Sequence, residues 1–432
     1  MRRWLVALLL ALALVRFGLV AYSGLTYSIG DFYSTMPGAY VETFNPILWN
    51  SPDLVDEVGK RPSYRRGPTQ LLTTLPLSYL NSYREIALVL LWVYGALVVA
   101  SAWLMWRTFS GSGRDLTLLA LIVSSSLLFY PTLVAYIARE FEVLLLFATV
   151  GLFAAARAKH EWAAGALTAY LSLFKYLPLG LLPLLVARRW WRALGGFAIT
   201  AGLMLAAAHV MFGLQNFSRD GFLGGYVVNL LPGNVEAFCM AYKDMHYVSH
   251  GHEASIRFAL CSLRGLAPLP IVPVYIALIV ATLAALAAGY FRAERASPLT
   301  AEAQSWRITW ELSAVLIVYT TFVYAHYYYL VFLIVPLTAV MVRAYQTRRA
   351  SLWIAWGASY LMLSAFLLPL SLVARLLKID AFTVYLQTLA YLPGILLLLG
   401  TVLVEYISVP RFRGSKVPTL EPRNSGTLEP KN

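Results

Sequence analysis

The chain has 432 residues, of which 59% are hydrophobic and only 13% are charged, and its formal net charge is +13. A soluble protein of this length cannot hide so much apolar surface, and apolar runs of membrane-spanning length recur from end to end. The composition therefore excludes a soluble globular protein. It indicates an all-α polytopic membrane protein, because helices satisfy their own backbone hydrogen bonds in lipid.

The apolar runs predict about twelve membrane helices within one domain that covers residues 1–408. The first run begins with Met-Arg-Arg and no small-residue cleavage site follows it, so we expect a retained helix and not a signal peptide. Residues 409–432 are polar and rich in proline, which predicts a disordered cytoplasmic tail. The expected spans are 4–22, 86–106, 116–136, 141–157, 162–173, 176–187, 190–212, 267–290, 308–325, 326–344, 351–374 and 385–407.

The segment 161–187 departs from this pattern. Basic clusters flank it on both sides, yet it is too short for two full crossings, and Lys175, Pro178 and Pro183 interrupt it. We predict a hairpin of two short helices with its bend at residues 174–178 (FKYLP), which would hold Lys175 near an outer cavity. A single long, kinked helix is the alternative, but it would break the alternation of charge along the chain.

Most of the basic residues gather between alternate spans, as they do in cytoplasmic loops. The positive charge therefore encodes topology and does not indicate a nucleic-acid partner. We expect both termini in the cytoplasm of a bacterium and a multi-pass protein of its inner membrane. The clustered residues are Arg2, Arg3, Arg107, Arg114, Arg157, Lys159, Arg188, Arg189, Arg192, Arg292, Arg295, Arg307, Arg343, Arg348, Arg349, Arg411, Arg413, Lys416, Arg423 and Lys431.

The same topology places two long loops, 23–84 and 213–266, on the outer face. The first loop contains a short, moderately apolar run at residues 67–77 (GPTQLLTTLPL), which predicts a re-entrant or interfacial helix. Cys239 and Cys261 lie in or near the second loop. They either form a disulfide, if the outer side is oxidising, or remain two isolated thiols.

Ionisable residues at the outer ends of helices are the candidates for chemistry, because charge at membrane depth is costly. Asp31 is the first of them, since a carboxylate just past the first span could take a proton from an acceptor at the lipid–water boundary. Asp53 shares its loop but lies farther from the span and has the character of solvated surface. No group of Cys and His residues has the spacing of a zinc site, so no metal is expected.

Three cations could bind a lipid phosphate or stabilise the structure. Arg139 either contacts the phosphate or forms an interfacial ion-pair patch with Glu140 and Glu142. Lys175 at the predicted bend either binds a phosphodiester or extends its ammonium group to the interface. His326, which three tyrosines follow at the junction of two spans, is either structural or part of the site.

Five motifs in order resemble a known family. Asp-Phe-Tyr at residues 31–33 is followed by YRRGP at 64–68 and LPL at 75–77. FKYLP at 174–178, which leads to RRWWRAL at 188–194, is the strongest match, and GHEASI at 251–256 and HYY at 326–328 are weaker ones. Together they resemble the polyprenol-phosphate-mannose-dependent mannosyltransferases of glycosyltransferase family 87, in the type C superfamily. REFE at 139–142 stands where that family often carries Gly-Gln-x-Asn.

The resemblance implies a type C glycosyltransferase-like bundle that moves a sugar, with mannose favoured, from a polyprenyl-phosphate carrier to an acceptor. The acceptor would be a hydroxyl group of a glycolipid or polysaccharide on the outer face, and the transfer would invert the anomeric centre. Asp31 would be the general base, and Lys175 with His326 or Arg139 would stabilise the departing phosphate. No cofactor is implied, because the lipid-linked sugar is a substrate. The expected substrate contacts are Tyr33, Tyr64, Arg65, Glu140 and His252.

Two other functions are compatible with a chain of this kind. A flippase or transporter of lipid-linked sugars would explain many spans and charges at membrane depth. Such proteins often have repeated halves and broken helices at the midplane, whereas the candidate polar groups here gather at the outer face. A non-catalytic subunit of an envelope-assembly complex is the third possibility.

Overall fold

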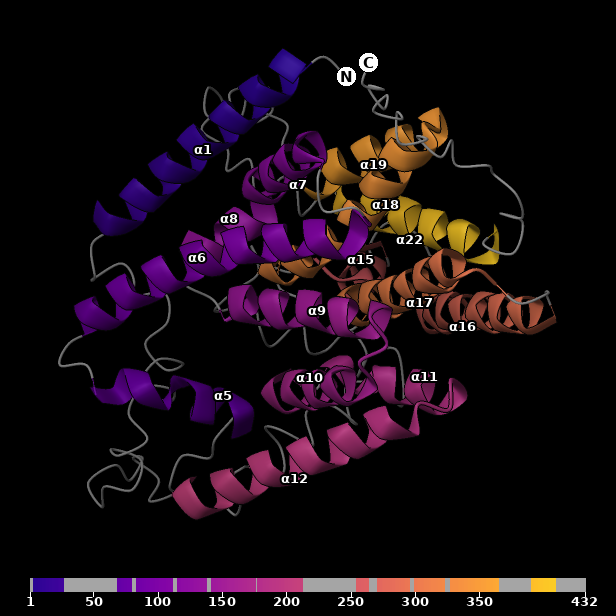
Figure 1. Ribbon diagram of the computed structural model, residues 1–432, viewed down its shortest axis with the longest axis horizontal. Helices are drawn as coiled ribbons and strands as arrows, with labels where there is room; N and C mark the ends of the chain where they lie inside the picture. The colour runs from indigo at the N-terminus through magenta and orange to yellow at the C-terminus, as the bar shows by residue number, and fades with distance from the viewer. Residues whose placement is uncertain are drawn as a thin grey trace, which may run out of the picture.

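The computed structural model describes residues 3–26, 68–79, 83–111, 115–137, 141–175, 177–212, 254–263, 270–295, 299–322, 327–364 and 390–408. In these residues the regular elements are α-helices and three short 3-10 helices (Figure 1), which confirms the all-α fold. In chain order they are α1 (Arg3–Thr26), α5 (Pro68–Thr74), η1 (Leu75–Tyr79), α6 (Tyr83–Phe109), α7 (Leu116–Leu128), α8 (Tyr130–Ile137), α9 (Glu142–Arg157), α10 (Glu161–Lys175), η2 (Leu177–Gly180), α11 (Leu181–Ala187), α12 (Trp191–Phe212), α15 (Ile256–Leu263), α16 (Ile271–Arg295), α17 (Ala301–Phe322), η7 (Tyr327–Leu333), α18 (Ile334–Thr347), α19 (Ala350–Leu363) and α22 (Tyr391–Ser408).

Six stretches of the described helices are long and apolar enough to cross a membrane, and α7 with α8 would make a seventh. These two helices are bent by 58°, and the residue between them, Phe129, is extended. Every span expected from the sequence overlaps a helical element, but α9, α10, α11 and α19 have only 16, 15, 7 and 14 residues. By length and composition, the described residues therefore contain fewer full crossings than the twelve expected.

The chain between residues 161 and 187 folds as the predicted hairpin. Helix α10 ends at Lys175, and η2 and α11 carry the chain from there to Ala187. The first turns of α10 and α12 pack on each other, so a chain that leaves that end at Glu161 must return to it by Trp191. Figure 1 shows α10 and α11 between α9 and α12. A single long, kinked helix would end far from the first turn of α12, so this alternative is wrong.

Two glycines allow α10 and α12 to approach so closely. A Cβ atom at Gly165 would lie 1.8 Å from the carbonyl oxygen of Ala193, and one at Gly196 would lie 2.5 Å from that of Trp162. Both obstacles are backbone atoms, which cannot rotate away. Small residues at such a contact are typical of membrane helices, which gain stability from close van der Waals packing.

We expect Gly165→Ala to destabilise the protein by about 1–3 kcal/mol, because the new methyl group must push the two helices apart. Gly202→Ala in α12 is the matched control, since a Cβ there meets nothing within 4 Å. The midpoint of thermal unfolding in detergent, at one heating rate, should fall for the first variant and not for the second. Equal midpoints would contradict the close approach of these helices.

The bundle has two ends that carry different residues. We call the end where α9 begins and α10 stops the Lys175 end, and the opposite end, where α9 stops and α12 begins, the Arg188 end. Helix α17 starts at the Arg188 end, because Arg307 and Glu311 in its first half contact the chain there. Five arginines from the predicted inner loops gather at this end, namely Arg157, Arg188, Arg307, Arg343 and Arg349.

These arginines are held by two buried glutamates and by aromatic rings. Glu311 of α17, which is 1% exposed, pairs with Arg188 and accepts hydrogen bonds from Arg307 Nε at 3.2 Å and the Tyr406 hydroxyl at 2.7 Å. Glu405 of α22 pairs with Arg349 and, at 4.0 Å, with Arg343. The basic clusters that the sequence assigns to loops are thus also part of the packed interior at this end.

Candidate functional site

Most of the predicted site residues lie outside the described residues. Lys175 is the last residue of α10, at the predicted bend, and only its backbone is described. The chain next to several of these residues is described, and it shows which elements meet. The predicted site residues outside the described part are Asp31, Tyr33, Tyr64, Arg65, Arg139, Glu140, His252 and His326.

The start of α9 and the end of α10 are in direct contact. Phe141, which follows Glu140 in the sequence, packs on Phe174, which precedes Lys175; their ring centroids are 5.8 Å apart. Phe141 is 8% exposed and Phe174 is 1% exposed, so this contact is part of the core. The chain next to Arg139 is thereby fixed beside the bend that carries Lys175.

The chain on both sides of His326 is also fixed near this end. Tyr327, the first residue of η7, is fully buried, packs on Tyr130 at 5.8 Å and donates a hydrogen bond to the carbonyl oxygen of Leu363 at 2.8 Å. On the other side, the carbonyl oxygen of Phe322 accepts a hydrogen bond from the hydroxyl of Tyr275 at 2.9 Å. Arg157 at the end of α9 donates a hydrogen bond to Thr309 near the start of α17, so α17 runs back along α9 and ends on the same side of the bundle as Phe141. Thr320 of α17 and Phe332 of η7 line the pocket together with Leu145 of α9, as this arrangement requires.

Residues 68–79 form the short helices α5 and η1, which confirms that the apolar run is helical. Pro68 is the first residue of α5, a position where its missing N–H leaves no hydrogen bond unmade. The hydroxyl groups of Thr73 and Tyr170 are hydrogen-bonded at 3.2 Å, and α5 packs on α10 and α12. This contact holds the chain that follows Tyr64 and Arg65 against the second half of α10.

The motif at residues 251–256 ends at the start of α15, inside the bundle. Ser255 is fully buried; its hydroxyl accepts a hydrogen bond from the N–H of Phe258 at 3.0 Å, and its carbonyl accepts one from the hydroxyl of Tyr391 at 3.2 Å. Cys261 in the same helix is disulfide-bonded, so it is not the isolated thiol that was one alternative. Cys239 lies outside the described residues.

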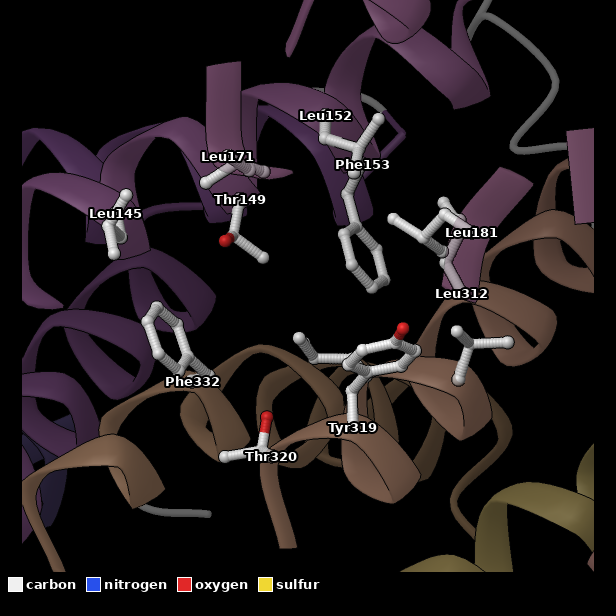
Figure 2. Close-up of a pocket in the computed structure, with 12 residues that line it drawn as sticks. Leu145, Thr149, Leu152, Phe153, Leu171, Leu181, Leu312, Tyr319, Thr320 and Phe332 are labelled. Carbon is white, nitrogen blue, oxygen red and sulfur yellow. The ribbon is translucent and has the colours of Figure 1, made fainter. Parts of the chain in front are cut away.

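An apolar pocket, partly open to the surroundings, lies between α9, α10, α11, α17 and η7 (Figure 2). Leucine, valine and phenylalanine side chains form most of its wall. Its polar groups are the hydroxyls of Thr149, Tyr319 and Thr320, and Figure 2 shows those of Thr149 and Thr320 beside the empty space. The sequence gives no sign of the pocket, because apolar residues at helical spacing are equally typical of a closed core.

Glu142 is a second feature that the sequence does not reveal. The pattern REFE allowed an interfacial ion-pair patch, but the structure buries Glu142 completely in the first turn of α9. Its burial depends on packing of the start of α9 against elements far away in the sequence, so spacing alone could not predict it.

Fold and site together define a polytopic helical membrane protein in which several helix ends that carry predicted charged residues meet beside an apolar pocket. The model of glycosyltransferase family 87 matches residues 66–236, from just before α5 to beyond the end of α12. The match covers less than half of the chain, and it confirms the resemblance in the part that contains α5, α9 and the hairpin. It supports a membrane glycosyltransferase. Neither the curated proteins nor the solved structures compared with the chain contain a match.

Proposed function

We propose that the protein transfers a sugar, with mannose favoured, from a polyprenyl-phosphate carrier to a hydroxyl group of a glycolipid or polysaccharide at the outer face of the membrane. The observation that carries this proposal is the meeting of helix ends at the Lys175 end of the bundle. Phe141 and Phe174 join the start of α9 to the bend at Lys175, and η7 packs against the same helix. The three cations predicted to bind phosphate are Lys175, His326 and Arg139. Each is thus at or close in sequence to a chain segment that packs at this end of the bundle.

In the proposed reaction, Asp31 takes the proton from the acceptor hydroxyl while that oxygen attacks the anomeric carbon of the donor sugar. The bond between the anomeric carbon and the phosphate oxygen breaks, and its electron pair leaves with the polyprenyl phosphate. The transition state resembles an oxocarbenium ion, and attack from the opposite face inverts the anomeric centre. Lys175, with His326 or Arg139, stabilises the charge that grows on the phosphate, so no general acid is needed.

The pocket supports a donor carried by a lipid. Its wall is almost entirely apolar, and three hydroxyl groups are too few to bind a free sugar or a nucleotide. An isoprenoid chain needs no hydrogen bonds and gains free energy from each apolar contact. The part of the pocket nearest to the Lys175 end is lined by Leu145, Leu171 and Thr320. An isoprenoid chain bound in the pocket with its phosphate at this end would therefore place the phosphate near the predicted cations.

The test is to incubate the purified protein with radiolabelled polyprenyl-phosphate mannose and a membrane lipid extract, and to look for a labelled glycosidic product. We expect a product with the lipid-linked donor and none with a nucleotide-linked mannose. A product with a different lipid-linked sugar would change the sugar but not the mechanism. The proposal is wrong if no lipid-linked sugar gives a product, and movement of the labelled lipid across vesicles without a new bond would indicate a flippase.

A further inference from the structure

We propose that Glu142 binds hydroxyl groups of the donor's sugar and so selects which lipid-linked sugar the protein accepts. This inference rests on the proposed function and adds a specificity-determining residue to it. Glu142 is the first residue of α9, and its side chain is fully buried. A buried carboxylate at membrane depth is costly, and such groups usually belong to a substrate pathway or a polar network.

The spacing of residues along α9 places Glu142 on the helix face that lines the pocket. Leu145, Thr149, Leu152 and Phe153 all line the pocket from α9, and they lie 3, 7, 10 and 11 residues beyond Glu142. With 3.6 residues per turn, these positions share one face of the helix. Glu142 therefore occupies the same stripe, about one turn beyond Leu145 toward the Lys175 end.

This position lies between the pocket and the bend that carries Lys175. Phe141, next to Glu142, packs on Phe174, next to Lys175. If the isoprenoid chain fills the pocket and Lys175 binds the phosphate, the sugar is the part of the donor that comes closest to Glu142. The carboxylate and the phosphate are both anions and repel each other, so the sugar is the part of the donor that Glu142 could bind.

The chemistry of a carboxylate fits a sugar. An ionised carboxylate only accepts hydrogen bonds, and each hydroxyl group of a sugar can donate one. A site that accepts a hydrogen bond from a particular hydroxyl group of the substrate discriminates strongly against a sugar that lacks that hydroxyl.

The experiment compares binding of two lipids, polyprenyl-phosphate mannose and polyprenyl phosphate without the sugar, to the full-length protein in detergent. Glu142→Gln keeps the shape of the side chain and removes its charge. We expect this variant to bind the sugar-bearing lipid about 10- to 100-fold more weakly and the sugar-free lipid equally well. Glu161→Gln, in the first turn of α10 at the Arg188 end, is the matched control and should bind both lipids as the wild type does.

Three outcomes would overturn the inference. The first is an equal fall in affinity for both lipids, and the second is unchanged affinity for both. The third is a fall in the midpoint of thermal unfolding of Glu142→Gln that is large enough to explain the weaker binding. A second test measures binding of donors that lack one hydroxyl group at a time to the wild type and to Glu142→Gln. At least one of these donors should bind about 10-fold or more weakly to the wild type and show no further loss with Glu142→Gln. If the wild type binds the donor but transfers nothing, the proposed function fails, whereas the comparison of the two lipids still decides the role of Glu142.

Discussion

Replacement of Asp31 by asparagine should lower the rate of sugar transfer by about 10²- to 10⁴-fold, the usual contribution of a general base. Asparagine has nearly the same shape as aspartate, but its amide cannot take the proton of the acceptor hydroxyl. Binding of the lipid-linked donor should remain, because in the proposed mechanism the cations and the pocket hold the donor. The expected change is therefore in kcat and not in the affinity for the donor.

The same substitution at Asp53 is the matched control, since this residue belongs to the same predicted outer loop but lies farther from the first span. Single-turnover transfer and equilibrium binding of the donor separate the two effects for each variant. Full transfer activity in Asp31→Asn would show that another group takes the proton. Loss of donor binding together with transfer would assign Asp31 to substrate binding.

The hairpin could be predicted because its signals are local. Basic clusters on both sides of residues 161–187 require the chain to return to the end at which it started. Lys175, Pro178 and Pro183 mark where a continuous helix is unfavourable. The long apolar helices follow in the same way from composition within one window of sequence.

The number of crossings was harder to predict, because several apolar segments are too short or too bent to span alone. The α7–α8 pair shows the difficulty, since an apolar run of suitable length is broken at Phe129 and bent by 58°. Hydropathy averages over such a break. Short helices such as α9 and α10 can be stable because they pack on neighbours, which a hydropathy window does not detect.

The candidate site could be predicted as a set of residue types but not as an arrangement. The contact between Phe141 and Phe174 joins two motifs that are 33 residues apart, and neither phenylalanine differs in sequence from an ordinary core residue. Glu142 belongs to a run of charges that is equally typical of an exposed patch. Its burial depends on tertiary packing around the start of α9, which has no local signature in the sequence.

Replacement of Glu311 by glutamine should destabilise the fold by about 3–5 kcal/mol, the usual result of removing one partner from a buried ion pair. Glu311 is 1% exposed and is shared by Arg188, Arg307 and the hydroxyl of Tyr406. The side chains of Arg188 and Arg307 are only 13% and 10% exposed, so they cannot turn to water without moving the helices. The amide keeps the volume but leaves two cations without their counter-charge.

Glu302→Gln in the same helix is the matched control. Its side chain is 67% exposed and lies 3.9 Å from Arg343, so its loss should cost less than about 1 kcal/mol. The free energy of unfolding, from equilibrium denaturation in mixed micelles, measures both variants. A second substitution, Arg307→Met, should restore part of the stability of Glu311→Gln, because it removes one of the stranded cations. If Glu311→Gln is as stable as the wild type, these arginines reach water in the folded protein. The link from α17 to Arg188, where the hairpin rejoins the bundle, would then not depend on charge.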